Sequence, residues 1–158
     1  MRRKLITAGV SAAFALTAFT LAALAPVSLN AAGDERELVE LPAMMQEHML
    51  GNMRDHLAAV NEILAALADD DPAAAGKIAE ARLGMSSLGS HGAAHMAPFM
   101  PERMQAIGTE MHHAASRFVV AVQDADLANS AEGRKAIFSA LGAVTETCVA
   151  CHAAFRIH

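Results

Sequence analysis

Apolar residues beyond about position 40 recur at steps of three and four positions, the spacing that places them on one face of an α-helix. No stretch alternates apolar and polar residues in the manner of a half-buried strand. Turn-forming residues interrupt the helical pattern at "DDDP", "SSLGSHG" and "NSAEG". The sequence therefore predicts an all-α fold with four helices, over about 42–68, 72–88, 101–127 and 130–155, and a short helical turn over 93–96.

The ends of these helices carry capping residues. Pro72 suits a first helical position, one of the three aspartates before it suits the cap, and Asn129 or Ser130 caps the last helix. Long helices with short connections predict an antiparallel, up-down-up-down four-helix bundle. The expected inward positions include Met45, Met49, Ile63, Ile78, Ala81 or Arg82, Met85, Met104, Met111, Phe118, Val122, Ile137, Leu141 and Val144. Phe138 and Phe155 are further aromatic candidates for the core or for cofactor packing.

The first 32 residues have the order of a secretory signal peptide. Basic residues at positions 2–4 precede an apolar run over 5–25, and proline and small residues follow. The run is also long enough for a membrane anchor, but the small residues after it favour cleavage at a bond between Ala25 and Gly33. The sequence predicts a signal peptide over 1–32, one domain over 33–158, a periplasmic location and no membrane anchor after cleavage.

Composition narrows the functional classes. Removing the leader leaves nine basic and seventeen acidic residues, a formal charge of −8. Nucleic acid requires a basic surface, so it is not an expected partner. The chain shows no Ser/His/Asp order, no carboxylate pair with an obvious pocket and no phosphate-binding glycine loop, so we expect a protein that is not an enzyme.

The end of the chain carries the most specific chemistry. The last eleven residues read "CVACHAAFRIH" and include both cysteines of the protein. On a helix Cys148, Cys151 and His152 are three and four positions apart and share one face. A CxxCH motif is typical of c-type haem attachment, in which the two thiols bond haem vinyl groups and the histidine ligates the iron.

Two other interpretations of the cysteine pair are weaker. A disulfide across CxxC would close a very small loop and stabilise little. A redox dithiol normally lies at a helix N-terminus, where the helix dipole lowers the thiol pKa, whereas this pair ends a predicted helix in an all-α chain.

The position of the motif in the last helix resembles the cytochrome c-prime family, exported four-helix bundles whose final helix carries CxxCHxxYR or a close variant. The matching residues are Cys148, Cys151, His152, Phe155 and Arg156. The resemblance spans essentially all of residues 33–158. It implies one covalent haem c per chain, with His152 as proximal iron ligand, Phe155 packing against the haem and Arg156 in the haem environment. Homodimers are common in the family, and the apolar width of the first helix allows one here.

The residue opposite His152 is the open point of this resemblance. In the family it comes from the first helix, as an apolar residue that leaves iron five-coordinate or as a ligating methionine. Counting back from "DDDP" selects Met53 as the distal iron ligand, and a slip of one turn selects Met49 or His56 instead. Core packing is the alternative role for such a methionine. The arginine that often precedes the distal residue in the family is absent, and Arg54 is a substitute.

Histidine and methionine are abundant, with eight His and ten Met. His91 and His95 are four apart, as are Met96, Met100 and Met104, and imidazole and thioether are copper ligands. Prolines at 98 and 101 break a continuous helix here, which weakens the spacing argument, and the neighbouring His112 and His113 point in different directions on a helix.

The sequence thus predicts a periplasmic cytochrome that transfers one electron at a time to a redox protein partner. The alternatives are a high-spin haem protein that binds a diatomic gas such as NO or CO at an open distal site, and a copper-binding role for the His/Met cluster.

Overall fold

A computed structural model describes residues 33–128 and 130–158, so the predicted signal peptide lies outside the described residues. The helices of the described part are α1 (Ala43–Ala68), α2 (Pro72–Arg82), α3 (Ala93–Met96), α4 (Glu102–Ala128) and α5 (Ala131–Ala154), with 3-10 turns at Met85–Ser87 and Ala97–Phe99. The all-α prediction is confirmed. The predicted bounds of α1, α3, α4 and α5 are correct to within one or two residues.

The caps are those that the sequence predicts. The Asp71 carboxylate accepts a hydrogen bond from Ala74 N at 2.8 Å, and Pro72 takes the first position of α2. The Ser130 hydroxyl accepts a hydrogen bond from Gly133 N at 3.0 Å at the start of α5. Each side-chain oxygen satisfies a backbone N–H that has no partner within its helix.

The predicted end of the second helix is wrong. The sequence indicates a helix to 88, but α2 ends at Arg82 because the backbone becomes extended at Gly84. A Cβ at Gly84 would lie 2.8 Å from the backbone Cα of Glu80, which is too close, so this turn favours glycine. The Glu80 carboxylate accepts a hydrogen bond from Ser86 N at 3.1 Å, which fixes the turn that follows.

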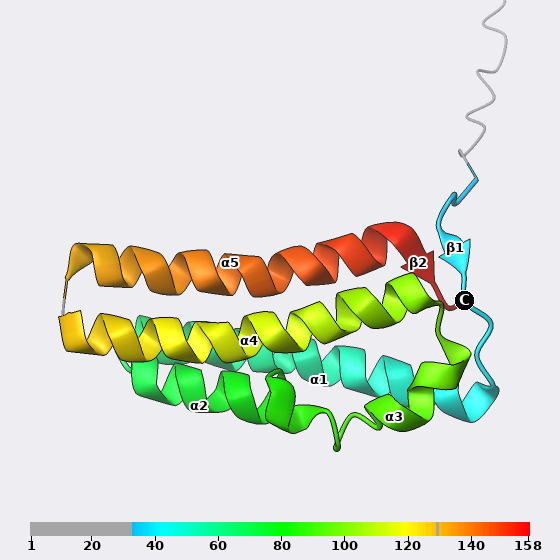
Figure 1. Ribbon diagram of the computed structural model, residues 1–158, viewed down its shortest axis with the longest axis horizontal. Helices are drawn as coiled ribbons and strands as arrows, with labels where there is room; N and C mark the ends of the chain where they lie inside the picture. The colour runs from blue at the N-terminus through cyan, green and yellow to red at the C-terminus, as the bar shows by residue number, and fades with distance from the viewer. Residues whose placement is uncertain (1–32, 129) are drawn as a thin grey trace, which may run out of the picture. The chain divides into compact units, whose positions relative to one another are not determined.

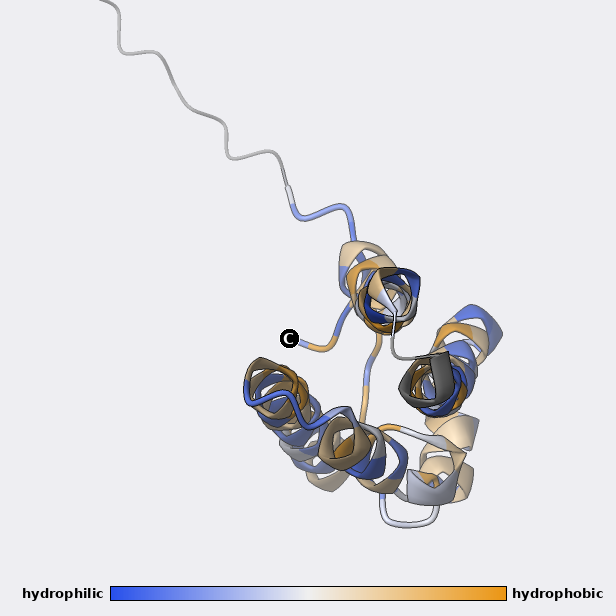
Figure 2. Cartoon of the chain, turned by 90° about the vertical axis from the view of Figure 1, so that its left-hand side faces the viewer, coloured by the Kyte–Doolittle hydropathy of each residue, from blue (hydrophilic) through white to orange (hydrophobic). Residues whose placement is uncertain are grey.

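The long helices lie alongside one another, and the colour ramp in Figure 1 shows that successive ones run in opposite directions. Among the described residues α4 packs along α5, α1 packs along α2, and α2 also contacts α4. Figure 2 looks along the helices and shows α1 and α5 standing apart on the remaining side. Among the described helices, α1 and α5 are therefore the neighbouring pair without extensive close contact.

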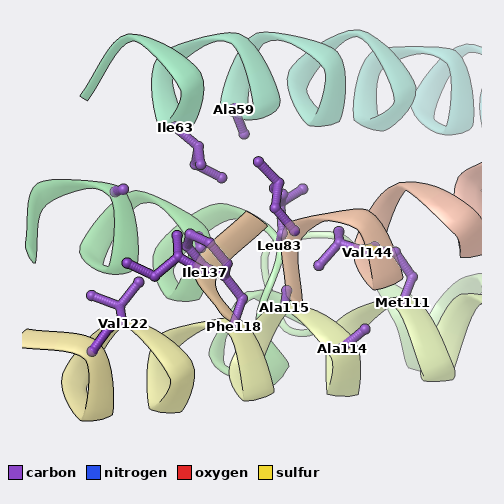
Figure 3. Packing of buried hydrophobic residues seen from close by; sticks show 14 residues of the cluster. Ala59, Ile63, Leu83, Met111, Ala114, Ala115, Phe118, Val122, Ile137 and Val144 are labelled. Carbon is purple, nitrogen blue, oxygen red and sulfur yellow. The ribbon is translucent and has the colours of Figure 1, made fainter. Parts of the chain in front are cut away.

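The larger core cluster fills the half of the structure near the α1–α2 turn (Figure 3). Phe118 and Ile63 are fully buried there, and small residues such as Ala59 and Ala115 let the helices approach closely. The predicted inward positions Met111, Val122, Ile137, Leu141 and Val144 also belong to this cluster.

Two predicted core positions are wrong. Phe138 on α5 is 57% exposed, and Ala81 on α2 is exposed while Ala75, Ala79 and Leu83 form the buried face. Helical spacing alone does not separate two neighbouring stripes on an alanine-rich helix, and that ambiguity explains both errors.

A second, smaller cluster occupies the opposite end, where α1 begins and α5 ends. Its buried residues are Val39, Met45, Met49, Met96, Met104 and Phe155. A two-residue parallel bridge, not expected from the sequence, pairs β1 (Glu37–Leu38) with β2 (Phe155–Arg156) at this end. The bridge fixes the last residues of the chain beside the segment that precedes α1.

α5 is, among the described helices, the one that is long and apolar enough to cross a membrane by length and composition. Mostly buried core helices share this property, whereas 17% of the most apolar stretch of α5 is buried. Here its Ile137, Leu141 and Val144 are buried in the larger cluster.

Candidate functional site

The CxxCH residues lie in the last two turns of α5, as the sequence predicts. Cys148 and Cys151 are half-buried and His152 is exposed. The Cys148 side chain packs against the larger core cluster and that of Cys151 against the smaller one, so the two thiols lie where the clusters meet. All three side chains line one cavity.

The two thiols are free, and burial raises the pKa of each. The Cys148 thiol donates a hydrogen bond to the Val144 carbonyl at 3.6 Å, one turn back on α5. A reactive redox dithiol requires the opposite environment, one that stabilises a thiolate. These surroundings favour the attachment interpretation of the pair over the redox one.

The cavity has a volume of about 700 Å³ and lies between α1 and α5. α1 forms one wall from Met49 to Val60, α5 forms another from Val144 to His152, and α4 and the α2–α4 connection close the remainder. Most of the lining side chains are apolar, among them Leu50, Leu57, Leu83, Leu88, Ile107 and Ile157. Both the volume and the lining are typical of a site for a bulky apolar ligand with a few polar groups.

Met53 lies on the α1 wall of this cavity and packs, partly buried, against the smaller core cluster. The structure thus brings the predicted distal residue and His152 to the same cavity. Met49 and His56, one turn to either side, also line it. The choice among these three residues as the distal ligand therefore stays a prediction.

The two remaining candidate residues, Phe155 and Arg156, follow directly after α5. Phe155 is buried, and the Arg103 guanidinium lies 5.8 Å from its ring centre. Arg156 lines the cavity, and its Nε is buried without a hydrogen-bond partner among the described residues. An Asp34 carboxylate oxygen lies 3.7 Å from it. A buried guanidinium N–H without a partner is costly, so this position suits an additional acceptor in the cavity.

A second arginine at the cavity was not identified from the sequence. Arg36 lines it and donates a hydrogen bond to the His152 carbonyl at 3.3 Å. Arg36 also forms an ion pair with Asp34, which together with nearby Arg156 holds the pKa of that carboxyl at about 2. No spacing rule connects position 36 with the end of the chain, because only the β1–β2 pairing brings them together. The proposed substitute Arg54 is exposed at the edge of the same cavity.

The structure groups the histidines differently from the sequence pattern. His91 is buried beside His56 and His112, with ring centroids 4.7 and 5.3 Å away, whereas His95 on α3 is exposed. The expected opposite orientation of His112 and His113 is confirmed, since His112 is buried and His113 exposed. The trio of His56, His91 and His112 lines the cavity and comes from three separate elements. Sequence spacing therefore could not reveal it.

Comparisons with family models, with curated proteins and with solved structures find no match for this chain.

Proposed function

We propose that this protein is a c-type cytochrome of the cytochrome c-prime type, which carries one covalent haem c and transfers single electrons. Cys148 and Cys151 would hold the haem through thioether bonds, and His152 would be the proximal iron ligand. The observation that carries the proposal is that all three side chains line one large, mostly apolar cavity.

The arrangement of the helices supports the corresponding fold, an antiparallel up-down-up-down bundle of α1, α2, α4 and α5. The alternating directions in Figure 1 agree with it, although α2 is much shorter than the others. α1 and α5 stand apart while the other neighbours pack closely. A flat cofactor inserted between these two helices would account for that separation.

The residues around the cavity fit such a cofactor. The buried Nε of Arg156 has no hydrogen-bond partner in the described chain, and a haem propionate would supply the missing acceptor. Phe155 lies in the core beside the attachment turn, where an aromatic ring can pack against a porphyrin edge. When bound, haem supplies one-electron iron chemistry, and the protein sets its potential through the ligands and the polarity around it.

Met53 is the proposed distal ligand. A thioether opposite a histidine raises the potential of haem iron and suits electron transfer. The acidic surface predicted from composition suits a basic redox partner, because complementary charge accelerates encounter. Export to the periplasm remains part of the proposal and rests on the sequence of residues 1–32.

Gas binding is the second candidate function. The cavity continues beyond Met53 along α1 to His56 and Val60, which leaves space next to the distal position for a diatomic ligand such as NO or CO. This role requires that Met53 does not bind the iron or that the gas displaces it.

The ferric absorption spectrum separates the two roles. A Met53 ligand predicts six-coordinate, low-spin haem with the weak far-red methionine-to-iron band, and Met53→Ala should remove that band and give high-spin haem. Met44→Ala is the matched control, because Met44 is 75% exposed on the same helix. A wild-type spectrum that is already five-coordinate and high-spin would favour gas binding, and an unchanged Met53→Ala spectrum would exclude Met53 as the ligand.

A further inference from the structure

The buried histidines on the cavity wall form a compact trio, which a haem with Met53 as its distal ligand would leave unused. His56 comes from α1, His91 from the α2–α4 connection and His112 from α4. The ring centroids are 4.7 Å apart for His56 and His91, 5.3 Å for His91 and His112, and 6.3 Å for His56 and His112. Three imidazoles from distant parts of the chain therefore share one small volume.

Hydrogen bonds fix the tautomer of His112 and suit the same tautomer of His91. His112 Nδ1 donates to the Leu83 carbonyl at 2.7 Å, which leaves a lone pair on Nε2. The Ser87 hydroxyl donates to the Gly84 carbonyl at 2.7 Å, so its oxygen can accept a hydrogen bond from His91 Nδ1, 3.4 Å away. Metal-binding histidines commonly have this arrangement, in which one ring nitrogen donates to the protein and the other is free to ligate.

The backbone of His91 is also held in place. Its carbonyl accepts hydrogen bonds from Asn52 Nδ2 at 3.0 Å and from His48 Nε2 at 2.9 Å, and both donors belong to α1. These two bonds tie the α2–α4 connection to the helix that carries His56. The distance between the His56 and His91 rings is thus set by the fold and not by a mobile loop.

The His56 ring differs from the other two because it lacks a hydrogen-bond partner among the described residues. Its Nε2 is buried and makes no hydrogen bond among the described residues. A buried polar nitrogen without a partner costs about 1–3 kcal/mol. The other two rings of the trio have a free lone pair on Nε2. A single electron-pair acceptor would therefore satisfy all three nitrogens together.

We propose that His56, His91 and His112 bind one divalent transition-metal ion, Cu²⁺ or Zn²⁺, on the cavity wall. A metal–nitrogen bond of about 2.0–2.1 Å places the centroids of imidazoles on a tetrahedral ion roughly 5 Å apart. The observed separations of 4.7 to 6.3 Å bracket that value. In residues 33–128 and 130–158 no three His, Cys, Asp or Glu side chains already surround one point, so binding requires these rings to rotate.

The chemistry of the trio selects the class of ion. Imidazole suits copper and zinc, while Mg²⁺ and Ca²⁺ require oxygen ligands. The nearby carboxylate of Asp55 already forms an ion pair with Arg82. Burial, followed by the charges of His91 and His112, lowers the pKa of His56 to about 4, and burial also lowers the pKa of His91.

This site replaces the copper site expected from sequence spacing, because His91 lies with His56 and His112 and not with His95. It does not depend on the proposed haem. The trio is part of the protein chain, and its binding can be measured whether or not haem is attached.

The test is a titration of the purified protein with Cu²⁺ and, separately, with Zn²⁺, with Mg²⁺ as the hard-ion control. We expect one Cu²⁺ or Zn²⁺ per chain and no comparable Mg²⁺ binding. His56→Gln and His112→Gln should each weaken binding by about tenfold or more, since each removes a ligand. The matched controls are His95→Gln and His113→Gln, which change exposed histidines in the same region and should leave the affinity unchanged.

Electron paramagnetic resonance of the Cu²⁺-loaded protein supplies a second measurement, because the hyperfine pattern reports nitrogen ligands. His91→Gln provides a third variant if either of the others fails to fold, with folding checked by circular dichroism. Equal affinity in wild type and all trio variants would overturn the proposal, as would an equal loss in His113→Gln. Haem content is measured on the same samples, so a colourless protein that still binds zinc would contradict the cytochrome and leave the metal site standing.

Discussion

At the residue scale, burial sets the chemistry of the two thiols. Both side chains are partly buried, and this burial raises the pKa of each thiol. Thiols in such surroundings are protonated at neutral pH and are poor nucleophiles. Their use as fixed attachment points, next to an exposed imidazole and a large apolar cavity, is compatible with this state.

A residue-scale prediction concerns Arg82, which forms ion pairs with Asp55 and Glu62 and so joins the end of α2 to α1. The hydrogen bond from Arg82 lowers the pKa of Asp55 below its ordinary value of 3.8. A carboxyl with a depressed folded-state pKa stabilises the protein above its ordinary pKa, and this contribution is lost as the pH falls through the lowered value. Arg82→Gln should therefore reduce the free energy of unfolding at neutral pH and have no effect in strong acid.

The expected loss is below about 1 kcal/mol, because both carboxylates are about half exposed. Urea unfolding of wild type and Arg82→Gln across the acid range measures it, with Lys77→Gln as control for an exposed cation on the same helix. A difference between wild type and Arg82→Gln that grows as the pH falls would contradict this account.

At the scale of elements, α4 and α5 approach each other closely near the turn that joins them. A Cβ at Gly133 on α5 would lie 3.1 Å from the Cα and Cβ of Ala125 and 3.3 Å from its carbonyl oxygen on α4. Backbone atoms cannot move aside as a flexible side chain can. The spacing of these two helices, and thus the position of α5 along one wall of the cavity, depends on this glycine.

Gly133→Ala should destabilise the protein by about 1 kcal/mol, since overpacking costs about 1–3 kcal/mol and the gain in helix propensity offsets about 1 kcal/mol of it. Gly142→Ala is the matched control on the same helix, where nothing lies within 4 Å of the added Cβ. That change should stabilise by up to about 1 kcal/mol. Thermal unfolding followed by circular dichroism measures both, and equal effects of the two variants would show that the contact does not limit the packing.

The elements themselves were predictable from the sequence where local signals were strong. Asp71, Pro72 and Ser130 mark helix starts through their own side chains, and the structure uses all three. The early end of α2 was not predictable, since it depends on the direction of the Glu80 side chain, whose carboxylate accepts a hydrogen bond from Ser86 N. The β1–β2 bridge was not predictable either, since it pairs segments from the two ends of the described chain. The exposed Phe138 shows the same limit, because a helical stripe does not say which neighbour will cover it.

At the scale of the whole molecule, the candidate site was partly predictable. The motif "CVACH" indicated three of its residues directly, because their function depends on local helical spacing. Counting back from "DDDP" selected Met53, which lies on the α1 wall of the cavity. Arg36 and the histidine trio come from segments that meet only in the folded chain, so no sequence pattern contains them.

The most direct test of the central claim is the haem content of the protein, produced with its leader in a host that attaches haem c, after extraction with acidified acetone. Free haem is removed by this treatment and thioether-bound haem is not. The account predicts one haem per chain retained by wild type and none retained by Cys148→Ala/Cys151→Ala, measured as the alkaline pyridine haemochrome. Because the sequence contains no Trp or Tyr, the near-ultraviolet absorbance of a haem-loaded protein would come almost wholly from haem. A colourless wild-type protein, or one whose haem is fully extracted, would contradict the claim.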